Sequence, residues 1–153
     1  MEIVKKRFSE LTLEELYSIL KVRAEVFVVG QNIIYQDMDG IDFSSTHLFI
    51  RENEQICSYL RIIDSGVKYK EMSIGRVLTI ESQRGKGYAR KLMELAIEDA
   101  EKRSQPVRIE AQAYLTDFYR SLGFKQVSDV FILEDIPHVE MILDESSSVA
   151  DSE

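Results

Sequence analysis

A short basic turn contains the residues whose types and spacing could bind a cofactor. Two glycines, Gly85 and Gly87, lie one residue apart between an apolar stretch and a long amphipathic one. Glycine allows the backbone to approach a ligand closely, and the free N–H groups at a helix start converge on one point. These donors and the positive end of the helix dipole favour a phosphate or pyrophosphate. Arg84, Lys86 and Arg90 add positive charge. The turn therefore predicts a site for the diphosphate of a nucleotide-like cofactor.

Two elements must position this turn: an apolar strand before it, over residues 73–80, and a helix after it. The helix is predicted because apolar residues recur at helical spacing while charged residues occupy the other face. This apolar stripe consists of Ala89, Leu92, Met93, Ala96, Ile97 and Ala100. A strand is expected at 107–111, after Pro106. Since a helix connects the two strands, we expect them to be parallel neighbours.

The N-terminal part of the chain predicts a strand, a helix and a loop. Residues 2–8 have the character of a short strand. Thr12 is a candidate N-cap, and Glu15 completes a capping box. The helix is expected to run to about Phe27 and to stop near Gly30. Residues 31–45 form a predicted loop in which Tyr35 and Gln36 are candidate substrate contacts.

The remaining segments predict a fold of class α+β, with a mixed, mostly antiparallel twisted sheet of six to seven strands flanked by about four helices. The chain is expected to form one domain over residues 1–143, followed by an acidic tail at 144–153 that we expect to be disordered. The other predicted strands are 46–51, 55–63, 124–127, 130–133 and 139–143, and a short helix is predicted at 115–122.

Composition excludes several classes of protein. The net charge of −8 argues against general nucleic-acid binding, which needs a broad basic face. No apolar run approaches the ~18 residues of a membrane span. The single cysteine, Cys57, excludes an intrachain disulfide and a cysteine-based metal cluster, and favours a cytoplasmic setting. The acids at 37, 39 and 42 lack the twelfth-position glutamate of a calcium loop, so no metal is expected.

Two common nucleotide motifs match the turn poorly. A P-loop requires Ser or Thr after its lysine, but Lys86 is followed by Gly87. A dinucleotide fingerprint requires a third glycine where this chain has Arg90. Glu110 lies near the distance at which that motif places a ribose-binding acid, so this reading is weak rather than excluded.

Two motifs together resemble the GNAT superfamily of N-acetyltransferases. Arg84-Gly85-Lys86-Gly87-Tyr88-Ala89 is similar to the family's Arg/Gln-x-x-Gly-x-Gly/Ala pattern, and Phe118-Tyr119 followed by Gly123-Phe124 is similar to its second signature. The order of predicted elements agrees from residue 1 to about 143. Segments 22–29, 35–40, 74–77, 111–113 and 136–138 resemble the ElaA-like branch. The chain departs from that branch at Gly30, where a glutamate is usual, and at Asp135-Ile136, where a glycine usually precedes the isoleucine.

The resemblance implies an acetyl-CoA-dependent N-acetyltransferase that acts on a primary amine by direct attack in a ternary complex. It implies that the pantetheine arm pairs with the main chain of Val77, Leu78 and Thr79. It also implies that Tyr119 is the general acid for the leaving thiolate. The implied diphosphate contacts run over Arg84, Gly85, Lys86, Gly87, Tyr88, Ala89 and Arg90, and Gln112 is expected to help hold the cofactor.

The general base and the acceptor are not determined by the sequence. A primary amine is the expected acceptor, and a small amine, a polyamine and a peptide are equally compatible. A catalytically silent coenzyme A-binding sensor or interaction module is the alternative function. The candidate bases are Asp39, His47, Glu110, Glu134, Asp135 and His138.

Overall fold

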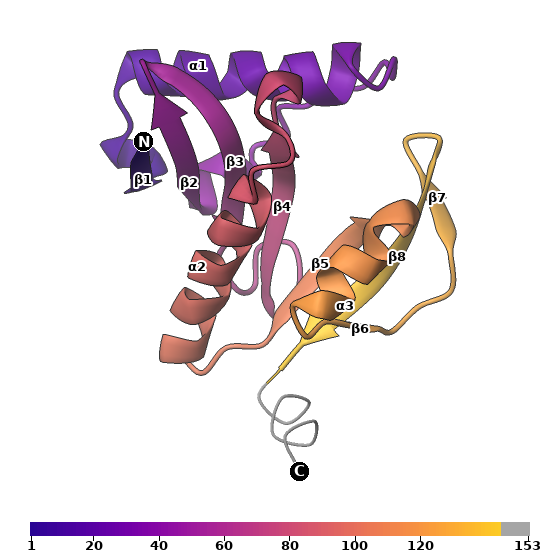
Figure 1. Ribbon diagram of the computed structural model, residues 1–153. Helices are drawn as coiled ribbons and strands as arrows, with labels where there is room; N and C mark the ends of the chain where they lie inside the picture. Colours follow the sequence, from indigo (N-terminus) through magenta and orange to yellow (C-terminus); the bar gives the residue numbers. More distant parts are fainter. Residues whose placement is uncertain (145–153) are drawn as a thin grey trace.

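The computed structural model describes residues 1–144, and its centre is one eight-stranded sheet (Figure 1). The strand order is β1-β2-β3-β4-β5-β8-β6, with β7 paired to β8. Of these pairs only β4–β5 is parallel. The predicted fold class is confirmed, with eight strands where six to seven were expected. They are β1 (Glu2–Arg7), β2 (Ser45–Glu52), β3 (Gln55–Ile63), β4 (Met72–Thr79), β5 (Val107–Gln112), β6 (Lys125–Gln126), β7 (Phe131–Leu133) and β8 (Ile136–Leu143).

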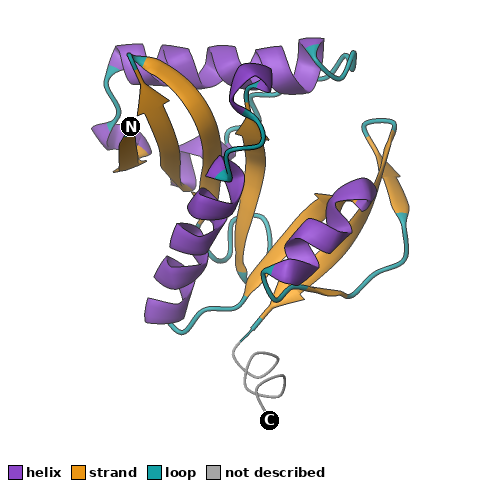
Figure 2. Cartoon of the chain, in the orientation of Figure 1, coloured by secondary structure: helices purple, strands orange, loops and turns teal. Residues whose placement is uncertain are grey.

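Three α-helices, rather than about four, cover the sheet (Figure 2). The first, α1 (Leu13–Arg23), continues directly into the π-helical segment η2 (Ala24–Val29). The second, α2 (Tyr88–Lys102), packs on the central strands, and α3 (Thr116–Ser121) packs on β5 and β6. Short 3₁₀ turns are η1 (Phe8–Glu10), η3 (Ile41–Ser44), η4 (Glu81–Gln83) and η5 (Ala113–Leu115). Among residues 1–144, no helix is long and apolar enough to cross a membrane.

Local sequence signals explain where the helices begin. The predicted capping box of α1 is present: the Glu15 N–H donates to the Thr12 hydroxyl at 3.0 Å, and the Thr12 N–H donates to the Glu15 carboxylate at 2.9 Å. In α2, the predicted apolar stripe is buried at Leu92, Met93, Ala96 and Ala100. Burial of this stripe against the sheet supplies most of the stability of such a helix.

Two apolar clusters lie on opposite faces of the sheet, because alternate residues of a strand point to opposite faces. Leu48 and Leu60 pack with α2 on one face. Phe49 and Tyr59 pack with Ile19 of α1 on the other. Cys57 is buried, as expected for a small apolar side chain. The sheet is therefore covered on both faces in its N-terminal half.

The parallel strands β4 and β5 separate along their length, and this separation creates the site. They pair only at Met72↔Val107 and Ser73↔Arg108, although β4 continues to Thr79. Figure 1 shows the two strands close at one end and far apart at the other. The predicted parallel pairing is confirmed, but the separation was not anticipated. The predicted disordered tail lies, apart from Asp144, outside the described residues.

A β-bulge in β4 accompanies the separation. Gly75 is opposite Arg61 of β3 and Leu78 is opposite Tyr59, so β4 has one extra residue in this interval. Arg76 takes a left-handed backbone conformation there, with φ of 52°. Because a bulge bends its strand and increases the local twist, this bulge contributes to the divergence of β4 from β5.

Candidate functional site

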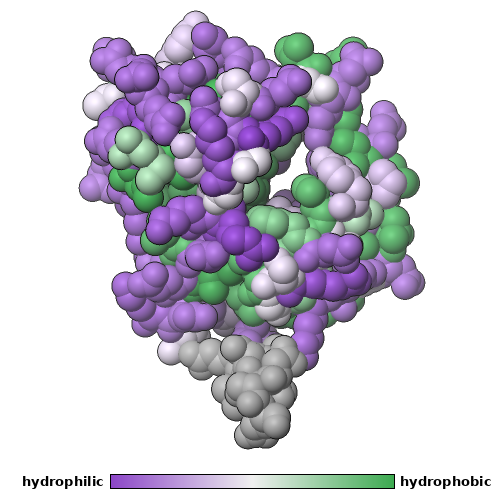
Figure 3. Space-filling view, in the orientation of Figure 1, coloured by the Kyte–Doolittle hydropathy of each residue, from purple (hydrophilic) through white to green (hydrophobic). Residues whose placement is uncertain are grey.

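A cleft of about 990 Å³ occupies the space between the diverging strands. Figure 3 shows the molecule hollowed between the part around α1 and the part around β5, α3 and β8. Residues from both faces of the sheet line this cleft, so it passes through the sheet rather than lying on one side. Of the residues predicted to contact the cofactor or to act on it, all except Lys86 line the cleft: Val77, Leu78, Thr79, Arg84, Gly85, Gly87, Tyr88, Ala89, Arg90, Gln112 and Tyr119.

The glycine turn has the backbone geometry and the open space that a diphosphate requires. Gly85 and Gly87 have φ of 83° and 78°, a left-handed conformation that favours glycine. A Cβ atom built at either glycine would meet no atom within 4 Å. Gly87 is the N-cap of α2, and no side chain caps this helix. The N–H groups of Tyr88, Ala89 and Arg90 therefore lack intrahelical acceptors and remain for an anion.

The side chains of the turn are engaged with neighbouring protein groups. Lys86 Nζ donates to the Gln83 side-chain oxygen at 2.6 Å. Arg84 Nε donates to the Thr79 carbonyl at 3.1 Å. The Tyr88 hydroxyl donates to Glu52 at 2.8 Å. These side chains are partly engaged with the protein, whereas the helix-start N–H groups of residues 88–90 lack intrahelical acceptors.

The first wall of the cleft, β4, is held by a cluster of arginines and aspartates that the sequence analysis did not identify. Arg76, on the bulge, donates from Nε to Asp37 Oδ1 at 2.8 Å and from Nη2 to the Asp37 carbonyl at 2.9 Å. Arg23 Nε donates to Asp37 Oδ2 at 2.9 Å. Asp37 thus joins α1 to the bulge of β4 and fixes the left-handed Arg76.

The cluster continues into the sheet through two further aspartates. Asp42 accepts from Arg23 at 2.6 Å and from Arg61 at 3.0 Å. Asp39 accepts from Arg61 at 2.6 Å. Arg23 and Arg61 are almost completely buried, and a buried guanidinium requires paired carboxylates. The available sequence signal was Arg61 itself, a charged residue in the middle of the apolar strand β3.

The second wall of the cleft consists of β5, β8 and α3. Ile109 and Ala111 belong to the apolar cluster with α2 and α3, so Glu110 and Gln112 point to the opposite face. His138 of β8 is directly opposite Gln112 and lies on the same face. Gln112 also accepts a hydrogen bond of 3.5 Å from Gln31, across the cleft. One face of this wall is therefore apolar and the other polar.

Tyr119 lies on the apolar face of this wall, at the boundary of the cleft. Its ring packs edge-to-face against Phe118 and Phe124, and the residue is 7% exposed. Burial, with a smaller contribution from Tyr114, raises the pKa of Tyr119 to about 12. The hydroxyl is therefore protonated at neutral pH and can donate to a group in the cleft. Within residues 1–144 it has no hydrogen-bond partner.

The six candidate bases occupy different environments. Asp39 is bound by Arg61; burial raises its pKa, but the hydrogen bond and charge of Arg61 outweigh that effect and hold the pKa well below its usual range. His47 is buried, near the Tyr59 hydroxyl and the Asp42 carbonyl, and burial lowers its pKa. Neither residue lines the cleft.

The other four candidates belong to the second wall. Glu110 forms an ion pair of 2.7 Å with Lys68 and accepts from the Tyr69 hydroxyl at 2.6 Å. Burial raises its pKa, but these two partners outweigh it and the pKa is lowered. Glu134 and Asp135 form the turn between β7 and β8, and Glu134 lines the cleft whereas Asp135 does not.

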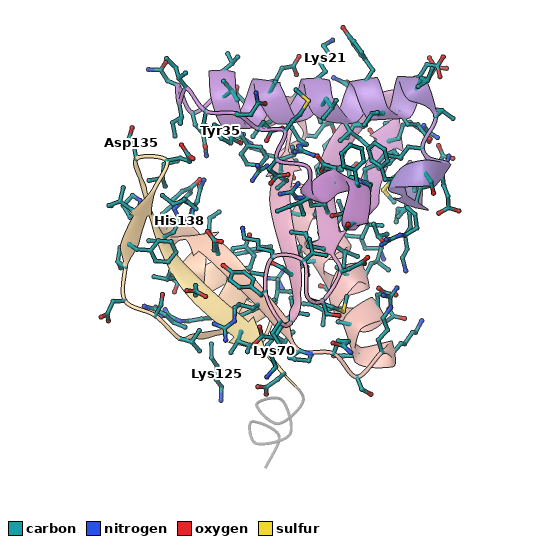
Figure 4. The ribbon with its side chains drawn as sticks, turned by 180° about the vertical axis from the view of Figure 1, so that it is seen from behind. Lys21, Tyr35, Lys70, Lys125, Asp135 and His138 are labelled. Atoms are coloured by element: carbon teal, nitrogen blue, oxygen red, sulfur yellow. The ribbon has the colours of Figure 1, made fainter. Side chains whose placement is uncertain are left out.

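Figure 4 shows the position of the remaining candidate. His138 and Tyr35 approach the opening from opposite sides, and Asp135 lies at the tip of the β7–β8 hairpin. His138 Nδ1 is 2.7 Å from the Ile136 carbonyl, and its ring stacks on Phe131. Among residues 1–144, no group of three or more His, Cys, Asp or Glu is arranged to hold a metal ion.

Comparisons with known proteins identify the family of this chain. Residues 12–145 match the model of the acetyltransferase (GNAT) domain. The ElaA protein of Escherichia coli is 38% identical over 137 residues, which are 87% of this chain and 90% of ElaA. A UPF0039 protein of Synechocystis sp. is 40% identical over 140 residues, 90% of this chain and 91% of that protein.

Solved structures give the same result. An acyl-CoA N-acyltransferase from Pseudomonas aeruginosa has a TM-score of 0.88 and 38% identity, covering 93% of this chain and 98% of its own. The crystal structure of E. coli ElaA has a TM-score of 0.87 and 35% identity, covering 94% and 99%. The fold is that of acyl-CoA N-acyltransferases. The chain belongs to the GNAT superfamily of acetyltransferases, in its ElaA-like branch.

Proposed function

We propose that the protein transfers an acetyl group from acetyl-CoA to a primary amine by direct attack in a ternary complex. The observation that carries this proposal is the cleft between β4 and β5, which is lined from both faces of the sheet. The glycine turn and Tyr119 lie on the side of α2 and α3, and the polar residues of β5 and β8 lie on the other. Two substrates can therefore meet between the strands without a covalent enzyme intermediate. The single cysteine is buried and does not line the cleft, which supports direct transfer. A single unpaired cysteine also favours a cytoplasmic setting.

Acetyl-CoA would bind along the first wall. Beyond Ser73, the edge of β4 that faces β5 has no strand partner in the described chain. Its main chain at Val77, Leu78 and Thr79 is available to pair with the amide groups of pantetheine, as an added strand pairs with a sheet edge. The diphosphate would then rest on the N–H groups of the turn, with Gln112 on the opposite wall.

Tyr119 is the proposed general acid. As the nitrogen of the acceptor forms its bond to the thioester carbon, the C–S bond breaks and the sulfur requires a proton. A tyrosine whose pKa is about 12 retains its proton at neutral pH and can give it to a thiolate nearby. Its position at the boundary of the cleft on the α3 side supports this role.

The acceptor is proposed to be a cationic primary amine. Glu25 and Glu134 line the cleft and, within the described chain, have no ion-pair partner. Together with the net charge of −8, they favour the approach of a cation. A lysine-like ammonium at pH 7 costs roughly 4.6 kcal/mol to deprotonate, so transfer requires a route for that proton.

The experiment is a turnover assay with acetyl-CoA and a panel of small amines, polyamines and peptide N-termini, with coenzyme A binding measured by calorimetry. Release of coenzyme A that depends on both acetyl-CoA and an amine is the expected result. Butyryl-CoA in parallel tests whether the acyl group is acetyl. Tight binding of acetyl-CoA without transfer to any amine would instead indicate a silent coenzyme A-binding module. Absence of binding would contradict both functions.

A further inference from the structure

We propose that His138 is the general base that accepts the proton of the acceptor amine, an inference that rests on the proposed acetyl transfer. His138 lies on β8, opposite Gln112 of β5, and lines the cleft on the face away from α3. Tyr119 lines the same cleft from the α3 face. An acid and a base on opposite sides of the cleft are placed to protonate the leaving sulfur and to deprotonate the incoming nitrogen.

The hydrogen bond of His138 determines which ring nitrogen can act as a base. Nδ1 is 2.7 Å from the carbonyl oxygen of Ile136. A carbonyl oxygen only accepts, so Nδ1 carries the hydrogen and donates it. In the neutral ring, Nε2 then has a free lone pair. Within residues 1–144 Nε2 has no hydrogen-bond partner, and it is not among the fully buried polar atoms that lack one. Nε2 therefore has accessible surface, and His138 lines the cleft.

The ring is also held in place. His138 is 8% exposed and stacks on Phe131, with ring centroids 6.1 Å apart and an interplanar angle of 25°. A side chain fixed by a hydrogen bond and a stacking contact loses little entropy when it meets its substrate. His138 thus has the orientation, the free nitrogen and the cleft position required of a base.

The other candidates lack at least one of these properties. Glu110 is occupied by Lys68 and Tyr69. Asp39, His47 and Asp135 do not line the cleft. Glu134 lines it, but its side chain extends from an exposed two-residue turn and, within the described chain, no hydrogen bond orients it.

Charged and titratable groups face His138 from several elements. Those of β5 and β8 on the same face are Arg108, Glu110 and Glu140, and Arg108 forms an ion pair of 3.2 Å with Glu140. The segment between β3 and β4 contributes Lys68 and Tyr69 through their contacts with Glu110, and β7 contributes only apolar residues. The hairpin turn contributes Glu134, and the first wall, with the segments around it, contributes Glu25, Tyr35 and Arg76.

The protons balance as follows. His138 Nε2 accepts one proton from the ammonium and releases it to water, which leaves a neutral amine. The amine nitrogen forms the C–N bond, and the C–S bond breaks. Tyr119 gives its hydroxyl proton to sulfur, and the second proton of the nitrogen replaces it through water. One acetyl-CoA and one ammonium thereby yield the amide, the free thiol of coenzyme A and one proton.

The test compares two histidine variants, because the chain contains only two histidines. His138→Asn retains a donor that can reach the Ile136 carbonyl but removes the base. With an alkyl amine at pH 7, kcat/KM should fall about 100-fold while the Kd of acetyl-CoA stays the same. Imidazoles generally change charge between about pH 5 and 8, so the acid limb of the native kcat/KM profile should disappear in this variant. The control, His47→Asn, should retain the acid limb.

A second measurement separates a base from a purely structural residue. Methoxyamine is neutral at pH 7, so His138→Asn should lower kcat/KM much less for acetyl transfer to methoxyamine than for acetyl transfer to an alkyl amine. Equal losses of kcat/KM for both amines, or an acid limb of the kcat/KM profile that persists in His138→Asn, would overturn the inference. If His138→Asn does not fold, judged by circular dichroism, His138→Gln is used in the same comparison. Failure of the native protein to turn over any amine would instead contradict the proposed function itself.

Discussion

The two walls of the cleft are built in different ways. The first wall, β4 with its bulge, is held by buried and partly buried pairs between Arg23, Arg61, Arg76 and three aspartates. The second wall, β5 and β8, packs an apolar face on α3 and presents Glu110, Gln112 and His138 to the cleft. The first wall therefore maintains the shape of the cleft and supplies backbone donors, whereas the second supplies most of the side chains that can take part in chemistry. Substitutions in the first wall should change the affinity for acetyl-CoA and the free energy of unfolding. Substitutions in the second wall should change kcat.

The largest effect should come from the glycine turn at the end of the first wall. Gly87→Val places a side chain in the space proposed for the diphosphate and strains a residue with φ of 78°. Loss of two charge-assisted hydrogen bonds should weaken acetyl-CoA binding by about 1000-fold, measured by calorimetry. Gly66→Val is the matched control, because Gly66 has φ of 83°, similar open space and a position outside the cleft lining. Equal loss of binding in both variants would contradict a specific role of Gly87.

The next effect should be on stability. Asp37→Ala leaves the buried Arg23 and the bulge residue Arg76 without a shared partner and should lower the free energy of unfolding by about 3 kcal/mol, measured by urea denaturation. Acetyl-CoA affinity should also fall, since Arg76 would no longer fix the bulge. Asp64→Ala removes a partly exposed ion pair with Arg7 and should change the free energy of unfolding by less than about 1 kcal/mol. Native-like stability of Asp37→Ala would show that the two walls are not held differently.

The second wall should respond in rate rather than in binding. Tyr119→Phe keeps the aromatic packing on Phe118 and Phe124 but removes the hydroxyl. We expect kcat to fall about 100-fold with little change in the Kd of acetyl-CoA, measured by steady-state kinetics and calorimetry. Tyr114→Phe, also at the cleft but largely exposed, is the control and should retain kcat. Full activity of Tyr119→Phe would exclude it as the acid.

The smallest effect should be a difference in acid stability between the walls. The pKa of Asp39 is lowered in the folded state, so its stabilisation is complete above the unfolded pKa of about 3.9 and is lost as the pH falls below that value. Between pH 5 and pH 2.5, Asp39→Asn should therefore lose about 1 kcal/mol less unfolding free energy than the native protein. Glu110→Gln, in the second wall, should reduce this acid-induced loss of unfolding free energy by less than Asp39→Asn does. The reason is that Glu110 has a lysine partner at the edge of the cleft rather than a buried arginine. A larger effect of Glu110→Gln than of Asp39→Asn would contradict the expected difference in acid stability between the two walls.

Much of the fold could be predicted because its signals are local. The capping box at Thr12 and Glu15, the apolar stripe of α2 and the alternation of the strands each depend on residues within a few positions of one another. The parallel pairing of β4 and β5 also followed from the helix that connects them. The helix was predicted to run to about Phe27 as an ordinary helix, whereas its last part is the π-helical segment η2 that ends at Val29, because the same residue spacing is compatible with both.

The site was predicted in part. The glycine turn and Tyr119 were identified by their motifs, and both line the cleft. The bulge at Arg76 and its clamp by Asp37 were missed, because a bulge depends on pairing with β3 and the clamp joins residues 39 positions apart. The acids at 37, 39 and 42 were noted as an incomplete calcium loop, and Asp39 also as a candidate base, but not as the partners that the buried Arg23 and Arg61 require.

By itself, the sequence determined the order of the elements, the glycine turn between strand and helix, and the presence of a tyrosine in the second motif, because hydrogen bonding and hydrophobic periodicity act over short distances along the chain. Only the tertiary structure decided that β4 and β5 diverge, that the cleft opens to both faces, and which nitrogen of His138 is free. Those properties depend on the register between strands and on buried charge pairs between distant segments, and they exist only once the sheet has formed.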